Sequence, residues 1–348
     1  MTKKNFARAT GIMLALTMLL SACSGGGDTG KTDGQTTGDT ASSSKETIKI
    51  GVANRTFKES AYLFMQQGSE AKAEEYGNVK IDWQACDLNI ANQKNIIENF
   101  ISQGYDAIVI EPCDSVSMVQ QAKEVRDAGI KLIFIEQKMD GIAPDIWITG
   151  NNYELGCKQV EDFVERWGED KPAKCVMLAG SDGDFAAEEI KRGVKETIAK
   201  HSNLELIFEQ TIQDWDREKA MKSMEDAISV NGDKINVVFA ANDGMALGAY
   251  KAAQNENLQE NMFFYGGDND QETNEMILAG AENIFVIDRG SYGHGGMITT
   301  AAVQLVNGED LTYDEEDADG YKCEWAPLTM VGYDNLEPSK VKFPDLFK

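Results

Sequence analysis

The chain has few basic residues, few histidines and no closely spaced cysteines. It contains 33 Lys and Arg against 58 Asp and Glu, which gives a formal net charge of −25. A surface this acidic repels phosphate backbones and offers no polybasic patch to anionic lipid, so neither nucleic acid nor a charged membrane surface is an expected partner. His201 and His294 are the only histidines, and no cysteines have metal-ligand spacing. The sequence therefore predicts no metal site and no cofactor.

Five cysteines follow residue 23, and they are scattered through the chain: Cys86, Cys113, Cys157, Cys175 and Cys323. Five is an odd number, so at least one thiol has no intramolecular partner. A chain that can bury a large core does not need a disulfide framework. We therefore expect buried and chemically inert cysteines, which would suit a reducing habitat.

The N-terminus carries the parts of a secretory signal. Lys3, Lys4 and Arg8 precede an apolar run over about residues 12–20, and the run ends in Leu20-Ser21-Ala22-Cys23. The run is too short to span a bilayer, which takes about 20 apolar residues. A basic start, a short apolar stretch and small residues before the cut are typical of a cleaved signal peptide.

Leu-Ser-Ala-Cys at the end of this run resembles the bacterial lipobox, in which the cysteine is lipidated and becomes the mature N-terminus. The resemblance predicts a signal peptide over residues 1–22, lipid attachment at Cys23 and a protein anchored outside the cytoplasmic membrane. Removing three basic residues and no acid would take the net charge from −25 to −28. The alternative is an ordinary signal peptide that happens to contain a cysteine. Residues 23–46 are rich in Gly, Ser, Thr and Asp and predict a flexible tether.

From residue 47 onward, short apolar runs alternate with amphipathic stretches, which indicates an α/β protein with parallel sheets built from right-handed βαβ units. The predicted strands cover residues 48–53, 79–83, 107–110, 130–135, 175–179, 204–209, 235–241, 262–265 and 284–287. The predicted helices cover residues 62–76, 89–102, 115–128, 152–167, 188–200, 216–229, 244–255 and a stretch after 291.

These strands are too many for one ordinary sheet, so we expect two doubly wound lobes. The N-terminal lobe takes residues 47–150 plus about 289–322, and the C-terminal lobe takes residues 151–288 plus about 323–348. No linker composition separates them, which predicts a narrow hinge crossed more than once. Open α/β sheets bind ligands at the carboxyl ends of their strands, so the cleft between the lobes is the expected site.

Polar and aromatic residues follow several of the predicted strands, and together they suit a sugar. Carboxylates and amides bind hydroxyl groups strongly, and an indole ring covers the apolar C–H face of a sugar. Each residue also has a structural alternative: Asp216 and Asp243 fit helix N-caps, and Trp215 fits a core ring. The residues at strand ends are Glu136, Trp215, Asn242, Asp268 and Asp288.

Three motifs give residues 47 to about 334 a resemblance to the periplasmic sugar-binding proteins of the ribose and galactose/glucose type, which are the receptors of ABC importers. The motifs are Asp214-Trp215-Asp216, Asn242-Asp243-Gly244-Met245-Ala246-Leu247-Gly248-Ala249 and Val331-Gly332-Tyr333-Asp334. The resemblance implies the type I periplasmic binding protein fold, a monomer, a monosaccharide ligand, an ABC permease as partner and no enzymatic activity.

The same resemblance implies a set of ligand residues. Trp215 corresponds to the stacking aromatic, Asn242 to the amide at a strand end and Asp268 to the acid after a Gly-rich strand. The full set implied is Glu59, Tyr62, Glu136, Arg192, Trp215, Asn242, Asp268 and Asp288. Glu136 and Asp288 depart from the usual side chains, and Gln137 replaces a basic residue, so the first-lobe half of the pocket is unusually acidic. The calcium loop of galactose-type members has no counterpart.

The sequence favours a hexose of the galactose or glucose kind because of Trp215 and Glu59, while ribose, xylose and inositol stay open. One alternative function is a sugar sensor for a chemoreceptor or a histidine kinase, which would use the same closure of the lobes. A second is a carbohydrate-active enzyme with Glu136 and Asp288 as paired acids. A sugar-responsive repressor is not expected, because no helix-turn-helix precedes residue 47.

Overall fold

The computed structural model describes residues 46–316 and 320–348. The predicted signal peptide at residues 1–22, the lipidated Cys23 and almost all of the tether at residues 23–46 lie outside the described residues. Within the described ranges, no helix combines the length and the apolar character needed to cross a bilayer.

A seven-stranded sheet forms the first lobe, in the order β11-β12-β5-β4-β3-β1-β2. All neighbouring strands are parallel except β11, which pairs antiparallel with β12. The central strands are almost wholly apolar and buried on both faces, as the middle of a parallel sheet requires. The strands are β1 (Ile48–Asn54), β2 (Val79–Ala85), β3 (Ala107–Ile110), β4 (Lys131–Ile135), β5 (Ile146–Gly150), β11 (Glu315–Glu316) and β12 (Lys322–Ala326).

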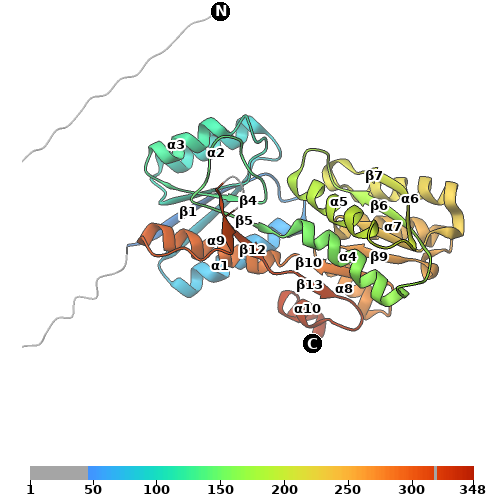
Figure 1. Ribbon diagram of the computed structural model, residues 1–348. Coiled ribbons are helices and arrows are strands. Elements are labelled where there is room, and N and C mark those ends of the chain that lie inside the picture. Colours follow the sequence, from blue (N-terminus) through green and yellow to red (C-terminus); the bar gives the residue numbers. More distant parts are fainter. Residues whose placement is uncertain (1–45, 317–319) are drawn as a thin grey trace, which may run out of the picture. The chain divides into compact units, whose positions relative to one another are not determined.

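Helices cover both faces of this sheet, as Figure 1 shows, with α2 (Ile90–Ser102) and α3 (Val119–Asp127) on one face and α1 (Ser60–Tyr76) and α9 (Ser291–Asn307) on the other. Successive residues of a strand point to opposite faces, so each strand feeds two cores. In β3, Ile108 and Ile110 pack with α2 and α3, whereas Ala107 and Val109 pack with α9.

A six-stranded sheet forms the second lobe, in the order β13-β10-β9-β8-β6-β7, and only β13 is antiparallel. The strands are β6 (Ala173–Ala179), β7 (Leu204–Thr211), β8 (Val237–Ala240), β9 (Phe263–Gly266), β10 (Ile284–Asp288) and β13 (Thr329–Val331). The helices are α4 (Asn152–Trp167), α5 (Phe185–Ile198), α6 (Arg217–Asn231), α7 (Asp243–Asn255), α8 (Gln271–Leu278) and α10 (Glu337–Lys342). Short 3-10 turns lie at Gln213–Trp215, Gly232–Lys234, Gln259–Asn261 and Pro344–Phe347.

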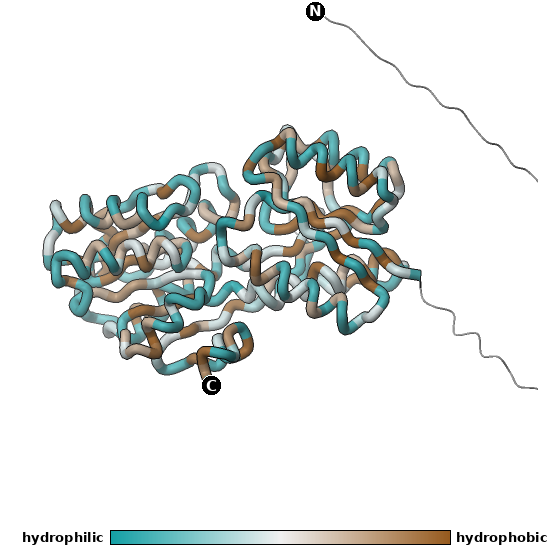
Figure 2. The backbone as a smooth tube through the Cα atoms, turned by 180° about the vertical axis from the view of Figure 1, so that it is seen from behind, coloured by the Kyte–Doolittle hydropathy of each residue, from teal (hydrophilic) through white to brown (hydrophobic). Residues whose placement is uncertain are grey.

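The predicted class, two doubly wound parallel-sheet lobes, is confirmed. Figure 2 shows the hydrophobic colour following the inner strands, while the helices alternate between hydrophobic and hydrophilic colour. Most predicted elements lie within a few residues of their place in the structure, but the sequence pattern missed the strands β5, β11, β12 and β13 and the helices α8 and α10. The predicted helix over residues 115–128 begins only at Val119, because the Asp114 carboxylate accepts from the backbone N–H groups of Val116 and Ser117 and holds a turn there.

The chain passes between the two sheets after β5, after β10 and after β12. The third passage lies after Ala326 and not near residue 323, where the boundary between the lobes was predicted, because β12 pairs with β5 in the first sheet up to Ala326. At the second passage Gly290 has φ 69°, and a Cβ there would lie 2.8 Å from the carbonyl oxygen of Pro327. The second and third passages therefore pack so closely that only glycine fits between them.

Candidate functional site

A cleft lies between the lobes at the carboxyl ends of the strands, where the sequence predicted it. Its outer part has a volume of about 540 Å³ and is lined from both lobes, by Arg55 and Glu59 of the first and by Trp215, Asn242 and Asp268 of the second. A smaller inner hollow shares Glu59 and Trp215 with it. The volume of the outer part falls in the range of small-molecule sites, roughly 300–1,000 Å³.

On the first-lobe side, the fully buried Glu111 pairs with the partly buried Arg55. Both residues directly follow strands, β1 and β3, which are neighbours in the sheet. The Arg55 Nε lies 3.6 Å from Glu111 Oε1, and the Arg55 backbone N–H donates to Glu111 Oε2 at 3.3 Å. The Tyr62 hydroxyl donates to the same carboxylate. Burial raises the pKa of Glu111 to about 8, although the charge of Arg55 opposes this shift.

Glu136 directly follows β4 in a left-handed conformation, φ 55°, and faces His294 of α9. His294 Nδ1 lies 3.2 Å from Glu136 Oε1, and its Nε2 lies 3.1 Å from the carbonyl oxygen of Ile148. A carbonyl only accepts, so Nε2 carries a proton and Nδ1 donates to Glu136 when the ring is an imidazolium. Burial would raise the pKa of Glu136, but the hydrogen bond and charge of His294 lower it overall, with Arg289 adding to the effect.

Arg289 is the central cation of the second-lobe side. Its Nε donates to the Gly267 carbonyl at 3.0 Å and lies 3.3 Å from Asp268 Oδ1, while Nη2 donates to the Ala241 carbonyl at 3.3 Å. The guanidinium thus joins the ends of β8, β9 and β10. Burial raises the pKa of Asp268 to about 6, against the attraction of Arg289.

Trp215 supplies the aromatic surface of the cleft. Asp214 and Trp215 both have left-handed backbones, with φ 62° and 52°. A Cβ on Gly180 would lie 2.5 Å from the Trp215 ring, so the indole rests directly on that backbone. The Arg289 Cζ lies 5.9 Å from the ring centroid. Only 8% of the Trp215 surface is exposed, yet the ring lines both hollows.

Left-handed backbone conformations gather at this edge of both sheets. Of the non-glycine residues with positive φ in the described chain, all but Asn257 follow the carboxyl end of a strand: Asp87, Leu88, Glu136, Asp214, Trp215 and Asn269. Each such conformation costs on the order of 1–3 kcal/mol and persists only where the surroundings hold it. Their concentration here marks the cleft as the specialised part of the molecule.

Direct contacts join the two lobes across the cleft. Asp184, which caps α5 in the second lobe, accepts from Arg55 Nη1 at 3.2 Å and from Gln137 Nε2 at 2.9 Å, both in the first lobe. The Ser60 hydroxyl of α1 donates to the Asp270 carboxylate of the second lobe. The structure is therefore a closed arrangement of the lobes.

The structure brings most of the predicted ligand residues together. Lining the outer or inner hollow are Glu59, Tyr62, Glu136, Trp215, Asn242 and Asp268.

The prediction that Arg192 lies in the cleft is wrong. Its side chain is 47% exposed on α5 and pairs with Glu189 at 2.7 Å, while its guanidinium stacks on Tyr153 at 3.9 Å. It lies on a helix face and not at a strand end, so it does not line either hollow of the cleft.

The prediction that Asp288 lies in the cleft is also wrong, because its carboxylate forms its contacts away from the cleft. It accepts from Asn269 Nδ2 and from the Gly290 N–H, both at 2.8 Å, and lies 3.7 Å from Lys342 Nζ. The strand β10 runs to Asp288, one residue past its predicted end, and side chains alternate along a strand. The next residue, Arg289, therefore takes the cleft position.

The sequence prediction missed four charged residues that line the hollows, Arg55, Asp184, Asp270 and Arg289, and also Glu111, which is buried against Arg55. The rule that found Glu136, a polar residue directly after a buried strand, applies equally to Glu111. It does not reach Arg55 or Arg289, because β1 and β10 each run one residue further than predicted. The structural alternatives hold in part: Asp216 caps α6 as predicted, but Asp243 is the first residue of α7, and the cap of that helix is the side chain of Asn242. The Asn242 oxygen accepts from the Met245 N–H at 2.9 Å, so its amide NH₂ is the group it can offer to a ligand.

Asp243 has a structural task beside the cleft. Its Oδ1 accepts from the N–H groups of Gly267 and Asp268, each at 2.9 Å, and its Oδ2 accepts from the Asp270 N–H at 2.7 Å. This buried carboxylate fixes the loop that presents Asp268.

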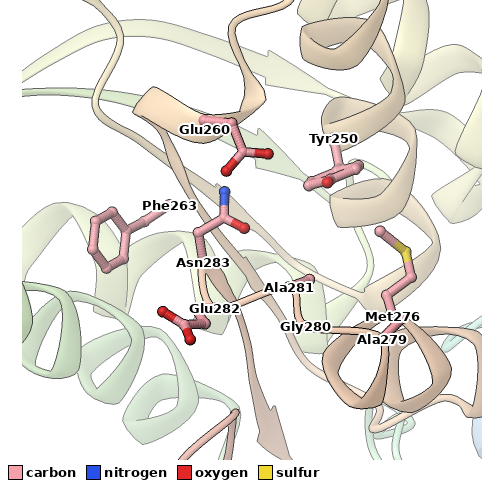
Figure 3. Close-up of a pocket in the computed structure, with 9 residues that line it drawn as sticks. All are labelled: Tyr250, Glu260, Phe263, Met276, Ala279, Gly280, Ala281, Glu282 and Asn283. Carbon is pink, nitrogen blue, oxygen red and sulfur yellow. The ribbon is translucent and has the colours of Figure 1, made fainter.

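A separate hollow of about 520 Å³, away from the cleft, lies wholly in the second lobe and includes Tyr250, Glu260 and Asn283 (Figure 3). Glu260 and Asn283 precede β9 and β10, so this hollow lies at the amino ends of the strands. The Asn283 amide already donates to the carbonyls of Gln259 and Met262. Parallel sheets bind ligands at the opposite end, and this hollow is not the candidate site. Within the described ranges, no cluster of three His, Cys, Asp or Glu residues is arranged to hold a metal ion.

The fold and the cleft define a two-lobed solute receptor, and comparison with known proteins gives its family. Residues 50–310 match the periplasmic binding protein domain, so the chain belongs to that family. The D-xylose-binding periplasmic protein of Escherichia coli (strain K12) is 27% identical over 281 residues, covering 79% of this chain and 83% of the relative. The D-allose-binding periplasmic protein of the same strain is 25% identical over 240 residues, covering 67% and 76%.

A solved structure shows the same architecture. An ABC transporter solute binding protein from Bacillus halodurans with bound myo-inositol aligns with a TM-score of 0.73 and 25% identity, covering 85% of this chain and 98% of that one. The type I periplasmic binding protein fold is confirmed, and the relatives are solute-binding proteins and not enzymes.

Proposed function

We propose that this protein binds a monosaccharide in the cleft between its lobes and delivers it to the permease of an ABC importer. The observation that carries the proposal is the grouping of Arg289, Asp268 and Trp215, which follow the carboxyl ends of β10, β9 and β7 in one sheet. A planar donor fork, a buried carboxylate and an indole ring are the three surfaces that a ring of hydroxyl groups with an apolar face requires.

The pairing within the cleft also supports a neutral polyol. Arg55 lies against Glu111 and Asp184, and Arg289 lies against Asp268. Paired charges accept and donate hydrogen bonds without needing a countercharge from the ligand. A ligand that lacks the matching hydroxyl groups would leave these buried groups unsatisfied, which is how such a site discriminates.

A hexose of the galactose or glucose kind is the favoured ligand. The indole of Trp215 offers a stacking surface for the ring, and Glu59 faces the same hollow with room to accept from a further hydroxyl. Burial raises the pKa of Glu59 to about 7, although Arg55 opposes the shift, so this carboxyl can also donate near neutral pH. The relatives named for D-xylose, D-allose and myo-inositol put pentoses, hexoses and cyclitols in the test set.

The experiment is a thermal-shift screen with galactose, glucose, allose, ribose, xylose and myo-inositol. A ligand that binds only the native state raises the melting temperature by mass action, by an amount set by its concentration relative to Kd. A rise with a hexose that exceeds the rise with the pentoses supports the proposal. No rise with any of these compounds, followed by no heat in calorimetry, contradicts it.

We propose further that the mature chain is anchored to the cell membrane through lipid on Cys23. The support is the Leu20-Ser21-Ala22-Cys23 sequence after a short apolar run. Labelled fatty acid should enter the wild-type protein in cells and be absent from Cys23→Ala. Equal labelling of both would contradict lipidation at this residue.

A further inference from the structure

Two cysteines of the first lobe are in direct contact beside the cleft. Cys86 directly follows β2, and Cys113 lies in the loop after β3. Their Sγ atoms are 3.0 Å apart, with a hydrogen bond between the thiols. That separation exceeds the length of a disulfide bond by only about 1 Å.

The sheet order explains why these two cysteines lie next to Arg55. β1 lies between β2 and β3, so the two sulfur atoms meet across the end of β1, where Arg55 enters the cleft. The Cys86 N–H donates to the Asn54 carbonyl at 3.0 Å, and its Sγ lies 3.5 Å from the Arg55 carbonyl oxygen. The two loops therefore form a strap over the backbone that positions Arg55.

A buried glutamine holds the other loop of the strap. Gln93 Oε1 accepts from the Cys113 N–H at 2.9 Å, and its Nε2 donates to the carbonyls of Ala53 at 3.1 Å and Glu111 at 2.6 Å. Cys113 is thus fixed relative to β1 and β3 by backbone contacts. Little movement of the main chain is needed to bring the sulfur atoms to bonding distance.

The pair also has the properties that thiol chemistry needs. The hydrogen bond between the thiols lowers the pKa of Cys86 to about 7, against the effect of burial and with help from backbone N–H groups of Leu88 and Asn89, and the same bond raises the pKa of Cys113. The proton of the ionised pair therefore stays on Cys113. A thiolate is the reactive form of cysteine. Cys86 is only 1% exposed, whereas Cys113 is partly exposed and is the sulfur that solvent can reach.

We propose that Cys86 and Cys113 are a modification site that forms a reversible disulfide by exchange with a low-molecular-weight disulfide, R–S–S–R. The Cys113 sulfur attacks one sulfur of R–S–S–R as its proton moves along the hydrogen bond to Cys86, and R–S⁻ leaves. That R–S⁻ takes the proton from Cys86. The Cys86 thiolate then attacks the Cys113 sulfur, and a second R–S⁻ leaves and takes a proton from water or buffer.

In net terms the two cysteines lose two electrons and two protons, and R–S–S–R becomes two R–SH. The second R–S⁻ takes its proton from solvent because the cysteine pair had already released one proton to solvent when Cys86 ionised. The new bond joins residues 27 positions apart and closes the strap around the end of β1. A crosslink of this span stabilises mainly by restricting the unfolded chain. It also fixes the loops that flank Arg55, so the oxidised form holds the first-lobe half of the cleft more rigidly.

The experiment treats the reduced full-length chain with oxidised glutathione, traps free thiols with N-ethylmaleimide and maps the peptides by mass spectrometry. We expect a Cys86–Cys113 crosslinked peptide that disappears with dithiothreitol. The melting temperature should rise by a few degrees, on the order of 5 °C. Cys113→Ser should show neither effect, and Cys157→Ser, which alters a buried cysteine of the second lobe, should show both.

Two outcomes would overturn the proposal. One is that Cys86 and Cys113 are both recovered as maleimide adducts after the oxidant treatment. The other is that glutathione stays attached to Cys113 and is not displaced by Cys86. The peptide map of the wild-type chain decides between these outcomes even if a serine variant fails to fold. None of these results depends on which sugar the cleft binds.

Discussion

The Nη1 atom of Arg55 in the first lobe lies 3.2 Å from the Oδ2 atom of Asp184 in the second lobe, and this ion pair spans the cleft. Asp184 also accepts from Gln137 at 2.9 Å and caps helix α5, so one carboxylate ties two first-lobe side chains to a second-lobe helix. A receptor that closes on its ligand depends on the free-energy difference between its open and closed forms. This pair contributes to the closed form.

Asp184→Asn should shift the protein without ligand toward the open form. Asparagine keeps an oxygen for the helix cap but loses the charge that attracts Arg55. We expect a larger radius of gyration in small-angle scattering and a sugar affinity reduced about threefold to tenfold. Glu189→Gln is the matched control, since Glu189 pairs with Arg192 on the outer face of the same helix. Equal scattering and affinity in both variants would remove Asp184 from the closure.

Trp215→Ala should weaken sugar binding at least tenfold, because the stacking surface is lost. Trp215→Phe keeps a ring on the Gly180 backbone and should retain most of the affinity. Calorimetry measures both affinities, and circular dichroism checks that each variant is folded. Unchanged affinity in the folded Ala variant would show that the indole is a core ring only.

Arg289→Ala and Arg192→Ala test the corrected assignment of the cleft arginine. Arg289 is buried against Asp268 and two carbonyl groups, so its loss should reduce affinity by at least tenfold and also lower the melting temperature. Arg192 is exposed on α5 and should leave affinity within a factor of two. A reversed pattern would restore the sequence-based assignment.

Glu111→Gln should change how stability depends on pH. The pKa of Glu111 is about 8 in the folded protein, against an ordinary value of 4.5, because it is buried. Between these values the folded state keeps a proton that the unfolded state has lost, so this group's contribution to stability is full below about pH 4.5 and is lost as pH rises through about 8. Glutamine does not titrate, so the melting temperature of the variant relative to wild type should rise from pH 5 to pH 8.

Glu98→Gln, at an exposed position of helix α2, should show no such trend and serves as the control for Glu111→Gln. A constant difference between Glu111→Gln and wild type across the pH range would mean that Glu111 is ionised throughout. Differential scanning fluorimetry in a series of buffers is sufficient for this comparison.

Gly290→Ala should destabilise the passage between the lobes by about 1–3 kcal/mol. The backbone there has φ 69°, and the new Cβ would lie 2.8 Å from the Pro327 carbonyl oxygen. Gly293→Ala, three residues along in the first turn of α9, meets no atom within 4 Å and should be neutral or stabilising by up to about 1 kcal/mol. Urea denaturation of the two variants compares them directly. Similar midpoints would show that the hinge tolerates a side chain.

Much of the fold and part of the site could be predicted before the structure. The rule that parallel strands present their following residues to one edge placed Glu136, Asn242 and Asp268 correctly in the cleft. It failed at β10, where a strand one residue longer than predicted exchanges the roles of Asp288 and Arg289. Arg192 failed for a different reason, because the family resemblance that implied it carried no information about which face of its helix points outward.

The alternation of apolar and amphipathic segments determined the two α/β lobes, because burying each strand between helices leaves few other ways to pack them. The strong excess of acid also came from the sequence alone. Only the tertiary structure decided which side chains meet: lobe closure brings Arg55 to Asp184, while sheet order and helix packing within the first lobe bring Glu136 to His294 and Cys86 to Cys113. Contacts between residues distant in the chain depend on strand order and on single-residue register, and no local pattern encodes either.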